Sequence, residues 1–247
     1  MKVALLADVH SNLEALTACL ADARLRGVDT HAFLGDLVGY GADPGAVLEI
    51  VGEHAGRGAI VVCGNHDVAA IDSGSETMNR VAAEAIAWTR KRLSKREREF
   101  LASLPLTARR ENALFVHASA AAPKDWVYVT DPVQAALSMC ATDAIYVFCG
   151  HVHEPMLYFT GAAGRPIPFE PVPGVVIPVP PRRRWLAIAG SVGQPRSGSP
   201  AARYAVADLG RATLTFFKVA YDWKTAAAKV RAAGLAERLA LRLERGK

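Results

Sequence analysis

Residues 60–67 read Ile60-Val61-Val62-Cys63-Gly64-Asn65-His66-Asp67, an apolar run followed by four turn-forming or polar residues. The apolar run predicts a buried strand, and Gly64 allows the backbone to turn sharply where that strand ends. Asn65 then offers a neutral amide oxygen, and His66 offers an imidazole whose ordinary pKa is close to neutrality. Such a segment is either an ordinary turn or part of an active site, and the rest of the chain helps to decide between the two.

The same layout, a short apolar strand that ends at Asp or His, recurs along the chain. It ends at Asp8-Val9-His10, Gly35-Asp36, His117 and Gly150-His151-Val152-His153. In an open α/β sheet the crevice beyond the carboxyl ends of the strands is where sites form, so we expect these side chains to converge. Of the seven histidines, only His31 and His54 lie outside this set, and we expect both to be structural.

Helix signals separate the predicted strands. Ser11 with Glu14 predicts a capping box, and Asp43-Pro44 and Asp131-Pro132 each predict an N-cap with proline at the first helical position. Residues 73–110 predict a helical insertion that contains a second capping box, formed by Ser94 and Glu97. Residues 166–181 are rich in proline, and we expect them to form a hairpin or lid loop. We expect residues 204–208 and 213–220 to form a closing hairpin. The last segment, residues 223–245, is expected to form one basic amphipathic helix.

Length and composition indicate a protein with one sizeable core. The chain has 247 residues, of which 51% are hydrophobic and 21% charged, and we expect a single domain over residues 1–247. No window approaches the roughly 18 apolar residues that a membrane helix requires. Asp8 and His10 interrupt the first apolar run too early for a signal peptide, and the four cysteines form no Cys-x-x-Cys pair. We therefore expect a cytoplasmic protein.

The chain is basic, with a formal net charge of +5 and a pI of about 9.1. This charge suits an anionic partner, but many of the arginines fall in predicted helices, where a solvated helix face explains them. No basic stretch is interleaved with aromatic residues that could stack on bases. The sequence therefore does not favour a nucleic-acid-binding module.

The side chains predicted to converge are two carboxylates, an amide and several imidazoles. This donor set suits divalent ions such as manganese, iron, zinc or nickel better than calcium, which prefers oxygen ligands throughout. A single ion would not use all of them. Two ions about 3.5 to 4 Å apart, bridged by a carboxylate, would use all of these ligands.

Five blocks of the sequence, taken in order, closely resemble the signature of the calcineurin-like metallophosphoesterases. The blocks are Asp8-x-His10, Gly35-Asp36, Gly64-Asn65-His66-Asp67, His117 and Gly150-His151-x-His153. Residues 88–105, 190–196 and the end of the chain resemble the small prokaryotic phosphodiesterase-type branch. The resemblance implies an α/β fold, a four-layer αββα sandwich of two mixed β-sheets. It also implies that Asp36 bridges two metals, the first held by Asp8, His10 and His153 and the second by Asn65, His117 and His151.

The predicted function is that of a dinuclear metal-dependent hydrolase of phosphate esters that prefers phosphodiesters to phosphomonoesters. A hydroxide that bridges two divalent ions would act as the nucleophile, with manganese preferred and iron, zinc, nickel or cobalt as alternatives. His66 is the predicted general acid, and Asp67 is expected to hold it protonated. Asn12 and Arg196 are predicted to bind substrate, although Asn12 is also next to a helix cap and Arg196 also fits a surface arginine; Tyr40 either lines the pocket or packs.

Several other functions use the same ligand types. Among enzymes, the alternatives are a dinucleoside-polyphosphate hydrolase, a nucleotidase, a protein phosphatase and a nuclease. The metal ligands cannot separate these enzymes, because they recognise the phosphate and not its substituents. Outside enzymes, the alternative is a non-catalytic metal-binding scaffold for a partner protein. We expect a small phosphate-ester substrate and neither a membrane nor a nucleic-acid partner, and the residues specify no oligomeric state.

Overall fold

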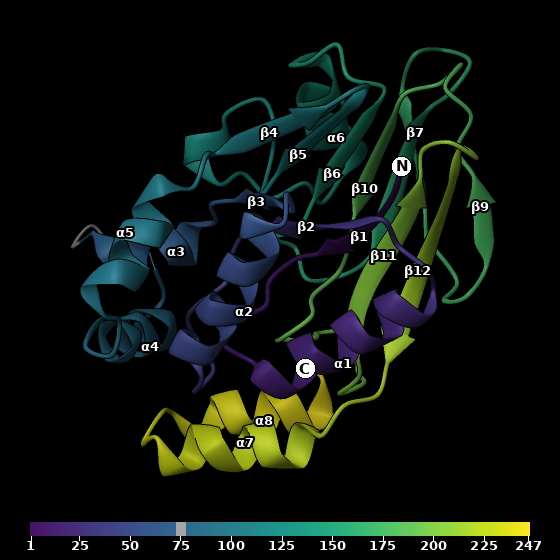
Figure 1. Ribbon diagram of the computed structural model, residues 1–247. Coiled ribbons are helices and arrows are strands. Elements are labelled where there is room, and N and C mark those ends of the chain that lie inside the picture. The colour runs from purple at the N-terminus through teal and green to yellow at the C-terminus, as the bar shows by residue number, and fades with distance from the viewer. Residues whose placement is uncertain (73–77) are drawn as a thin grey trace.

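Two six-stranded mixed sheets form the centre of the structure, a computed structural model that describes residues 1–72 and 78–247 (Figure 1). The first sheet has the order β3 (Ile60–Val62), β2 (Thr30–Leu34), β1 (Lys2–Leu6), β11 (Ala202–Asp208), β12 (Thr213–Val219) and β9 (Val176–Pro178). The second has the order β4 (Thr107–Arg110), β5 (Ala113–Val116), β6 (Tyr146–Cys149), β10 (Trp185–Ile188), β7 (Met156–Thr160) and β8 (Pro166–Phe169). Strands β1 to β3 are parallel, as are β5, β6 and β10.

Alternation of side chains along the strands sets the layers. On β1, Val3 and Leu5 join the core between the sheets, which also contains Phe115 and Phe148 of the second sheet. Ala4 and Leu6 instead face the helices α1 (Leu13–Leu25) and α2 (Pro44–Gly56). On the far side, α6 (Pro132–Cys140) covers the outer face of the second sheet. The predicted four-layer αββα sandwich of two mixed sheets is therefore confirmed.

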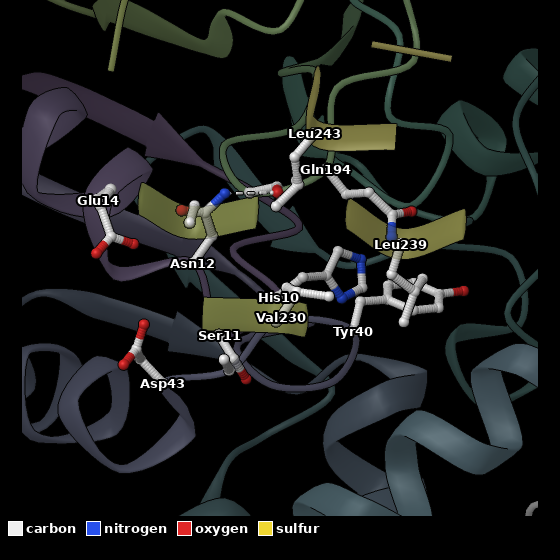
Figure 2. Close-up of a pocket in the computed structure, with 14 residues that line it drawn as sticks. His10, Ser11, Asn12, Glu14, Tyr40, Asp43, Gln194, Val230, Leu239 and Leu243 are labelled. Carbon is white, nitrogen blue, oxygen red and sulfur yellow. Dashed lines mark hydrogen bonds between the residues drawn. The ribbon is translucent and has the colours of Figure 1, made fainter. Parts of the chain in front are cut away.

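The remaining helices lie at the edges of this sandwich. Helices α3 (Asn65–Ile71), α4 (Arg80–Arg90) and α5 (Lys95–Ser103) follow β3 (Figure 1). Helices α7 (Trp223–Ala232) and α8 (Glu237–Arg245) pack on each other and share a core cluster with Tyr40 and α4. Val230, Leu239 and Leu243 line a cavity of about 10 Å³ with His10 and Tyr40 (Figure 2). The last two helices thus form part of the wall around His10.

Three predicted helix starts are confirmed in the structure. Ser94 and Glu97 form the predicted capping box. Asp131 accepts hydrogen bonds from the amides of Val133 and Gln134, and Asp43 precedes Pro44 at the start of α2. The predicted hairpin at the end of the first sheet is confirmed as the antiparallel pair β11 and β12.

Two predictions about helices are wrong. The N-cap of α1 is Asn12, whose side chain accepts a hydrogen bond from the amide of Ala15. The backbone amide of Ser11 is instead bound to the carbonyl of Leu37, which fixes Ser11 in the preceding loop. The single helix predicted over residues 223–245 is two helices, because Gly234, at a φ of 70°, ends the first.

Two predictions about strands are also wrong. The helical insertion predicted over residues 73–110 contains α4 and α5, but residues 107–110 form β4, which pairs with β5; residues 73–77 lie outside the described residues. The proline-rich segment 166–181 forms neither a hairpin nor a lid loop. Its two strands pair with different sheets, β8 with β7 and β9 with β12. Both are edge strands, where proline is tolerated because one side of the strand needs no donor.

No helix in residues 1–72 and 78–247 has the length and apolar character needed to cross a membrane.

His31 on β2 and His54 on α2 are not among the predicted site residues and contact each other, with ring centroids 4.5 Å apart. Burial lowers the pKa of His31 to about 4 and also lowers the pKa of His54. The unfolded chain therefore takes up a proton at a higher pH than the folded protein does. The free energy of unfolding should fall as the pH drops below about 6.5.

We predict that His31→Gln reduces this pH dependence. Between about pH 7 and pH 5 the variant should lose less stability than the wild type, by roughly 1 kcal/mol after allowance for the partial exposure of His31. Urea denaturation at a series of pH values measures the difference. Parallel curves for the two proteins would contradict the expectation.

Candidate metal centre

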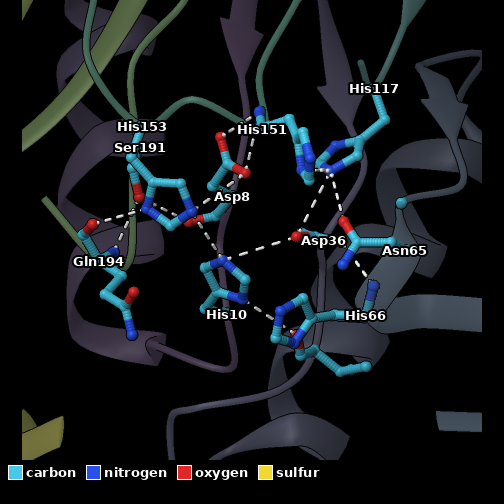
Figure 3. A network of polar contacts seen from close by, with 12 residues as sticks. Asp8, His10, Asp36, Asn65, His66, His117, His151, His153, Ser191 and Gln194 are labelled. Carbon is cyan, nitrogen blue, oxygen red and sulfur yellow. Dashed lines mark hydrogen bonds and ion pairs between the residues drawn. The ribbon is translucent and has the colours of Figure 1, made fainter. Parts of the chain in front are cut away.

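The seven predicted metal ligands all lie just past the carboxyl ends of strands (Figure 3). Asp8 and His10 follow β1, Asp36 follows β2 and Asn65 follows β3. From the second sheet, His117 follows β5, and His151 and His153 follow β6. Because these strands are parallel within each sheet and the sheets lie face to face, both sheets deliver their ligands to one place.

The backbone at these positions is unusual. Left-handed φ values occur at five of the seven ligands: Asp8 (54°), His10 (48°), Asp36 (52°), His151 (67°) and His153 (71°). Each such non-glycine residue costs on the order of 1 to 3 kcal/mol, and residues of this kind gather where function demands a particular geometry. The sandwich therefore holds the ligands in conformations that the free chain disfavours.

Two glycines allow the ligand loops to approach each other. A Cβ on Gly64 would collide with the backbone amide and carboxylate of Asp36, and a Cβ on Gly35 would lie 2.8 Å from His117 Nδ1. Gly35 also has a φ of 82°. Only glycine fits at both positions, which explains the Gly-Asp and Gly-Asn pairs seen in the sequence.

Three histidines are oriented by backbone carbonyls. The Nδ1 atom of His10 lies 3.2 Å from the carbonyl oxygen of Val38. The Nδ1 atom of His117 lies 2.7 Å from the carbonyl oxygen of Leu34, and that of His153 lies 2.8 Å from the carbonyl oxygen of Gln194. A carbonyl oxygen only accepts hydrogen bonds, so Nδ1 must donate and carry the hydrogen in each ring. In the neutral imidazole Nε2 then presents a lone pair, which is the form that binds metals.

These lone pairs face one another. His10 Nε2 lies 3.3 Å from His153 Nε2, and His117 Nε2 lies 3.1 Å from His151 Nδ1. Potential ligand atoms within 4.8 Å of one another form three groups: Asp8, His10 and His153; Asp36, His117 and His151; and His10, Asp36 and His66. Paired lone pairs and carboxylates repel one another unless a cation lies among them, so the arrangement fits divalent metal ions.

Asp36 connects the groups. Its Oδ2 atom lies 3.7 Å from His10 Nε2 and 3.4 Å from His117 Nε2, while Oδ1 accepts the backbone N–H of His66 at 2.8 Å. A single oxygen therefore reaches histidines of both ligand groups. Asn65 Oδ1 lies 3.2 Å from His117 Nε2, which places the amide with the group around His117.

Burial dominates the electrostatics of the site. It raises the pKa of Asp8 to about 7 and lowers the pKa of His10, of His153 and, to about 3, of His151. Burial also acts on Asp36, but the neighbouring imidazoles hold the pKa of this carboxyl well below its usual range. Burial would also lower the pKa of His117, but the carboxylates of Asp36 and Asp8 outweigh burial and raise this pKa to about 9. The site therefore combines neutral imidazoles with one imidazole that favours its protonated form and with poorly solvated carboxylates, whose negative charge a bound cation would balance.

His66 lies beside these groups without being fixed by them. It is 5% exposed, and its ring centroid is 4.8 Å from that of His10 and 4.5 Å from that of Tyr40. Its Nδ1 atom is buried and has no hydrogen-bond partner among the described residues. Burial lowers its pKa. His66 is thus a neutral imidazole with one ring nitrogen that is buried beside Gly39 and makes no hydrogen bond to the described residues.

The structure corrects the role expected of Asp67. Oδ1 accepts the amides of Leu37 and Val38, at 2.8 and 3.2 Å, and Oδ2 accepts the amide of Gly64 at 2.9 Å. All of these bonds go to the backbone and none to the His66 ring. Asp67 therefore ties the loop after β2 to the start of α3, and it positions both ligand loops instead of holding His66 protonated.

Asn12 and Arg196, the two residues predicted to bind substrate, differ in how their side chains are used. Asn12 caps α1 through Oδ1, and its Nδ2 donates to the Gly193 carbonyl and to the Tyr221 hydroxyl. Both amide hydrogens are used within the protein, which gives Asn12 a structural role in place of the expected substrate contact. Arg196 is partly buried, and its positive charge acts on the pKa of Asp8, His10 and His153. It therefore lies close to the ligand groups.

A cavity of about 530 Å³ opens onto the site. Asn65, His66 and His151 line it, together with Tyr40, for which lining the pocket was one of the two expected roles. Trp126 and Tyr128, which the sequence analysis missed, also line it. The Tyr128 ring stacks on the His151 ring, with ring centroids 3.9 Å apart. The ring centroids of Trp126 and His117 are 5.9 Å apart. The sequence did contain a sign of this role, because both aromatic residues lie in the segment that follows His117 and this segment has no helix or strand periodicity.

Comparison with known proteins yields matches over most or all of the chain. Residues 1–212 match the family model of the calcineurin-like phosphoesterase superfamily domain. An uncharacterized protein of Methanocaldococcus jannaschii is 33% identical over 251 residues, which cover 99% of this chain and 98% of that protein. The crystal structure of a metallophosphoesterase from Sphaerobacter thermophilus is 38% identical, with a TM-score of 0.90 over 100% of this chain and 99% of that one. A hypothetical protein from Pyrococcus horikoshii shares the fold, at 20% identity and a TM-score of 0.79 over 100% and 98% of the two chains.

We predict that Asp67→Ala is strongly destabilising. The substitution leaves three backbone amides without their acceptor in a buried site, at a cost of about 1 to 3 kcal/mol for each unsatisfied group. Asp67→Asn keeps one acceptor oxygen and should lose less. Chemical denaturation measures both variants, with Asp125→Ala as an exposed control. A wild-type denaturation midpoint for Asp67→Ala would rule out the positioning role.

Proposed function

The chain belongs to the calcineurin-like phosphoesterase superfamily of metal-dependent hydrolases of phosphate esters, and from this premise we propose that it is a dinuclear enzyme that prefers phosphodiesters to phosphomonoesters. The observation that carries the proposal is the position of Asp36 Oδ2 between His10 and His117. A carboxylate oxygen shared by two groups of imidazoles is what a pair of ions requires.

In this proposal Asp8, His10 and His153 hold one ion, Asn65, His117 and His151 hold the other, and Asp36 bridges them. The orientation of the histidines by Val38, Leu34 and Gln194 supports the assignment, because a metal-binding imidazole commonly donates its other N–H to an acceptor of this kind. The mixture of nitrogen and oxygen donors favours manganese, with iron, zinc, nickel or cobalt as alternatives.

When bound, two such ions polarise the phosphoryl oxygens and lower the pKa of water so that a nucleophile forms near neutral pH. The residues of the chain would hold the ions and keep bulk water away from them, since each of the histidines and carboxylates assigned to the ions is at most 5% exposed. His66 is the proposed donor of a proton to the leaving oxygen. The place of His66 on the wall of the large cavity, with a ring nitrogen within 4.8 Å of an Asp36 oxygen, supports this role, and a bound anion would favour the protonated ring as the Asp36 carboxylate does.

The size of the cavity supports a diester. A space of about 530 Å³ beside His66 and Asn65 accommodates substituents on both sides of a phosphate. A scaffold without catalysis has no need of a buried imidazole that lacks a partner, which counts against that alternative. The dinucleoside-polyphosphate hydrolase and the protein phosphatase differ from our proposal only in the substituents, so a substrate panel separates them.

We predict hydrolysis of bis(p-nitrophenyl) phosphate that depends on added manganese and stops when a chelator is added. Asp36→Ala should reduce the rate by roughly 100-fold or more, since the shared ligand is lost from both ions. Metal analysis of the purified variant should show less than the wild-type metal content. Hydrolysis that persists after complete removal of metal would exclude the proposed mechanism.

We predict that His66→Ala lowers kcat by about 10² to 10⁴ for esters with poor leaving groups, because the proton donor is lost. For p-nitrophenyl esters, whose leaving group needs little protonation, the loss should be smaller. The metal content should stay at the wild-type value. Equal losses for good and poor leaving groups, or loss of metal, would refute the role of His66.

A further inference from the structure

Two arginines beside the candidate site share one neutral acceptor. Arg196 Nη2 donates to Gln194 Oε1 at 2.9 Å, and Arg242 Nη1 donates to the same oxygen at 3.3 Å. Arg196 lies in the loop between β10 and β11, whereas Arg242 lies on α8. The C-terminal helix pair therefore brings a second guanidinium to the loop that carries the first.

Arg196 and Arg242 differ from those arginines of the described chain that are paired with the carboxylate of an aspartate or a glutamate. Arg26 is paired with Asp22, and Arg231 with Glu237 and Glu244. Within residues 1–72 and 78–247, neither Arg196 nor Arg242 forms an ion pair with an aspartate or a glutamate, and Arg196 Nε is buried without a hydrogen-bond partner. Arg242 Nε donates to the backbone oxygen of Lys247 at 3.2 Å. Both arginine side chains are partly buried. Two like charges around a neutral oxygen repel each other, and an anion would remove that repulsion.

The pair lies next to the ligand group of Asp8, His10 and His153. Gln194, which is 1% exposed, accepts the His153 Nδ1 hydrogen through its backbone carbonyl (Figure 3). Its side-chain oxygen accepts hydrogen bonds from both arginines. Tyr40 connects the pair to the centre, since its ring lies 4.7 Å from that of His10 and both guanidiniums act on its hydroxyl. The arginines thus lie beside Gln194 and Tyr40, which both contact histidines of this group.

We propose that Arg196 and Arg242 bind a second anionic group of the substrate, a phosphate or a carboxylate, while the scissile phosphate lies at the metal centre. The inference rests on the proposed hydrolase function and narrows the substrate to phosphate esters that carry a further anion. A guanidinium matches the paired oxygens of such groups and keeps its charge at all relevant pH values. Gln194 is a positioning residue, because it orients both guanidiniums without neutralising them.

The test compares two phosphodiesters with the same leaving group. One is p-nitrophenyl phenyl phosphate, and the other carries a phosphonate on the phenyl ring. The wild type should hydrolyse the phosphonate ester with a kcat/KM roughly ten-fold higher, mainly through a lower KM, as expected for charge-assisted hydrogen bonds. An analogue with a carboxylate on the ring shows whether the subsite prefers phosphate or carboxylate.

Arg242→Ala should bring the ratio of the two kcat/KM values close to one, and Arg242→Lys should retain part of it. Arg245→Ala is the matched control, because it removes the same charge from an exposed position of the same helix and should keep the wild-type ratio. This comparison separates binding between the guanidiniums from a general effect of net charge.

Gln194→Glu provides a test that does not remove either arginine. Its carboxylate would pair with both guanidiniums, so the preference for the phosphonate ester should fall while thermal stability is kept or raised. A wild type that hydrolyses both esters equally well, or a ratio unaffected by Arg242→Ala, would overturn the inference and leave the hydrolase function standing. A wild type that hydrolyses neither ester with any divalent metal would instead overturn the proposed function, and this inference with it.

Discussion

The rest of the site depends on a carboxylate buried among imidazoles. Asp36 is 1% exposed, yet its two oxygens are used by the His66 amide, His10 and His117. This contact is possible only because Gly64 has no side chain and because Asp67 binds the loop after β2 to the start of α3. Desolvation of a carboxylate is costly, so positive partners must be supplied at the same place. The fold meets this requirement by joining ligands from two sheets.

The two sheets must be packed together for the site to exist. Asp8, Asp36 and Asn65 come from the first sheet, while His117, His151 and His153 come from the second. The apolar core between the sheets, which contains Leu5, Phe115 and Phe148, fixes the relative position of the sheets. The same core stabilises the left-handed backbone at five ligands, which local sequence alone would not favour. Folding stability and ligand geometry are therefore properties of a single interface.

The sequence predicts what is local or repeated, and misses what depends on distant partners. The ligand positions follow from apolar strands that end at Asp or His, and the caps at Ser94 and Asp131 follow from short-range hydrogen bonds. Strand β4 (Thr107–Arg110) is mostly polar and exposed and becomes a strand only through β5, so its sequence carries no strand signal. The proline-rich segment likewise takes its two pairings from opposite sheets. Two of the three amides that Asp67 accepts, those of Leu37 and Val38, lie 30 and 29 residues away, which no local pattern reveals.

The position of α7 and α8 has a consequence for the order of events during synthesis. All seven predicted ligands precede residue 154, whereas Val230, Leu239 and Leu243, which wall the space beside His10 and Tyr40, come from the last two helices. A chain emerging from the ribosome thus presents its full complement of cation-binding groups well before that wall is in place. The predicted ligands, however, can converge only after β10, β11 and β12 have completed the two sheets, and the docking of α7 and α8 then encloses the space beside His10 as the last step.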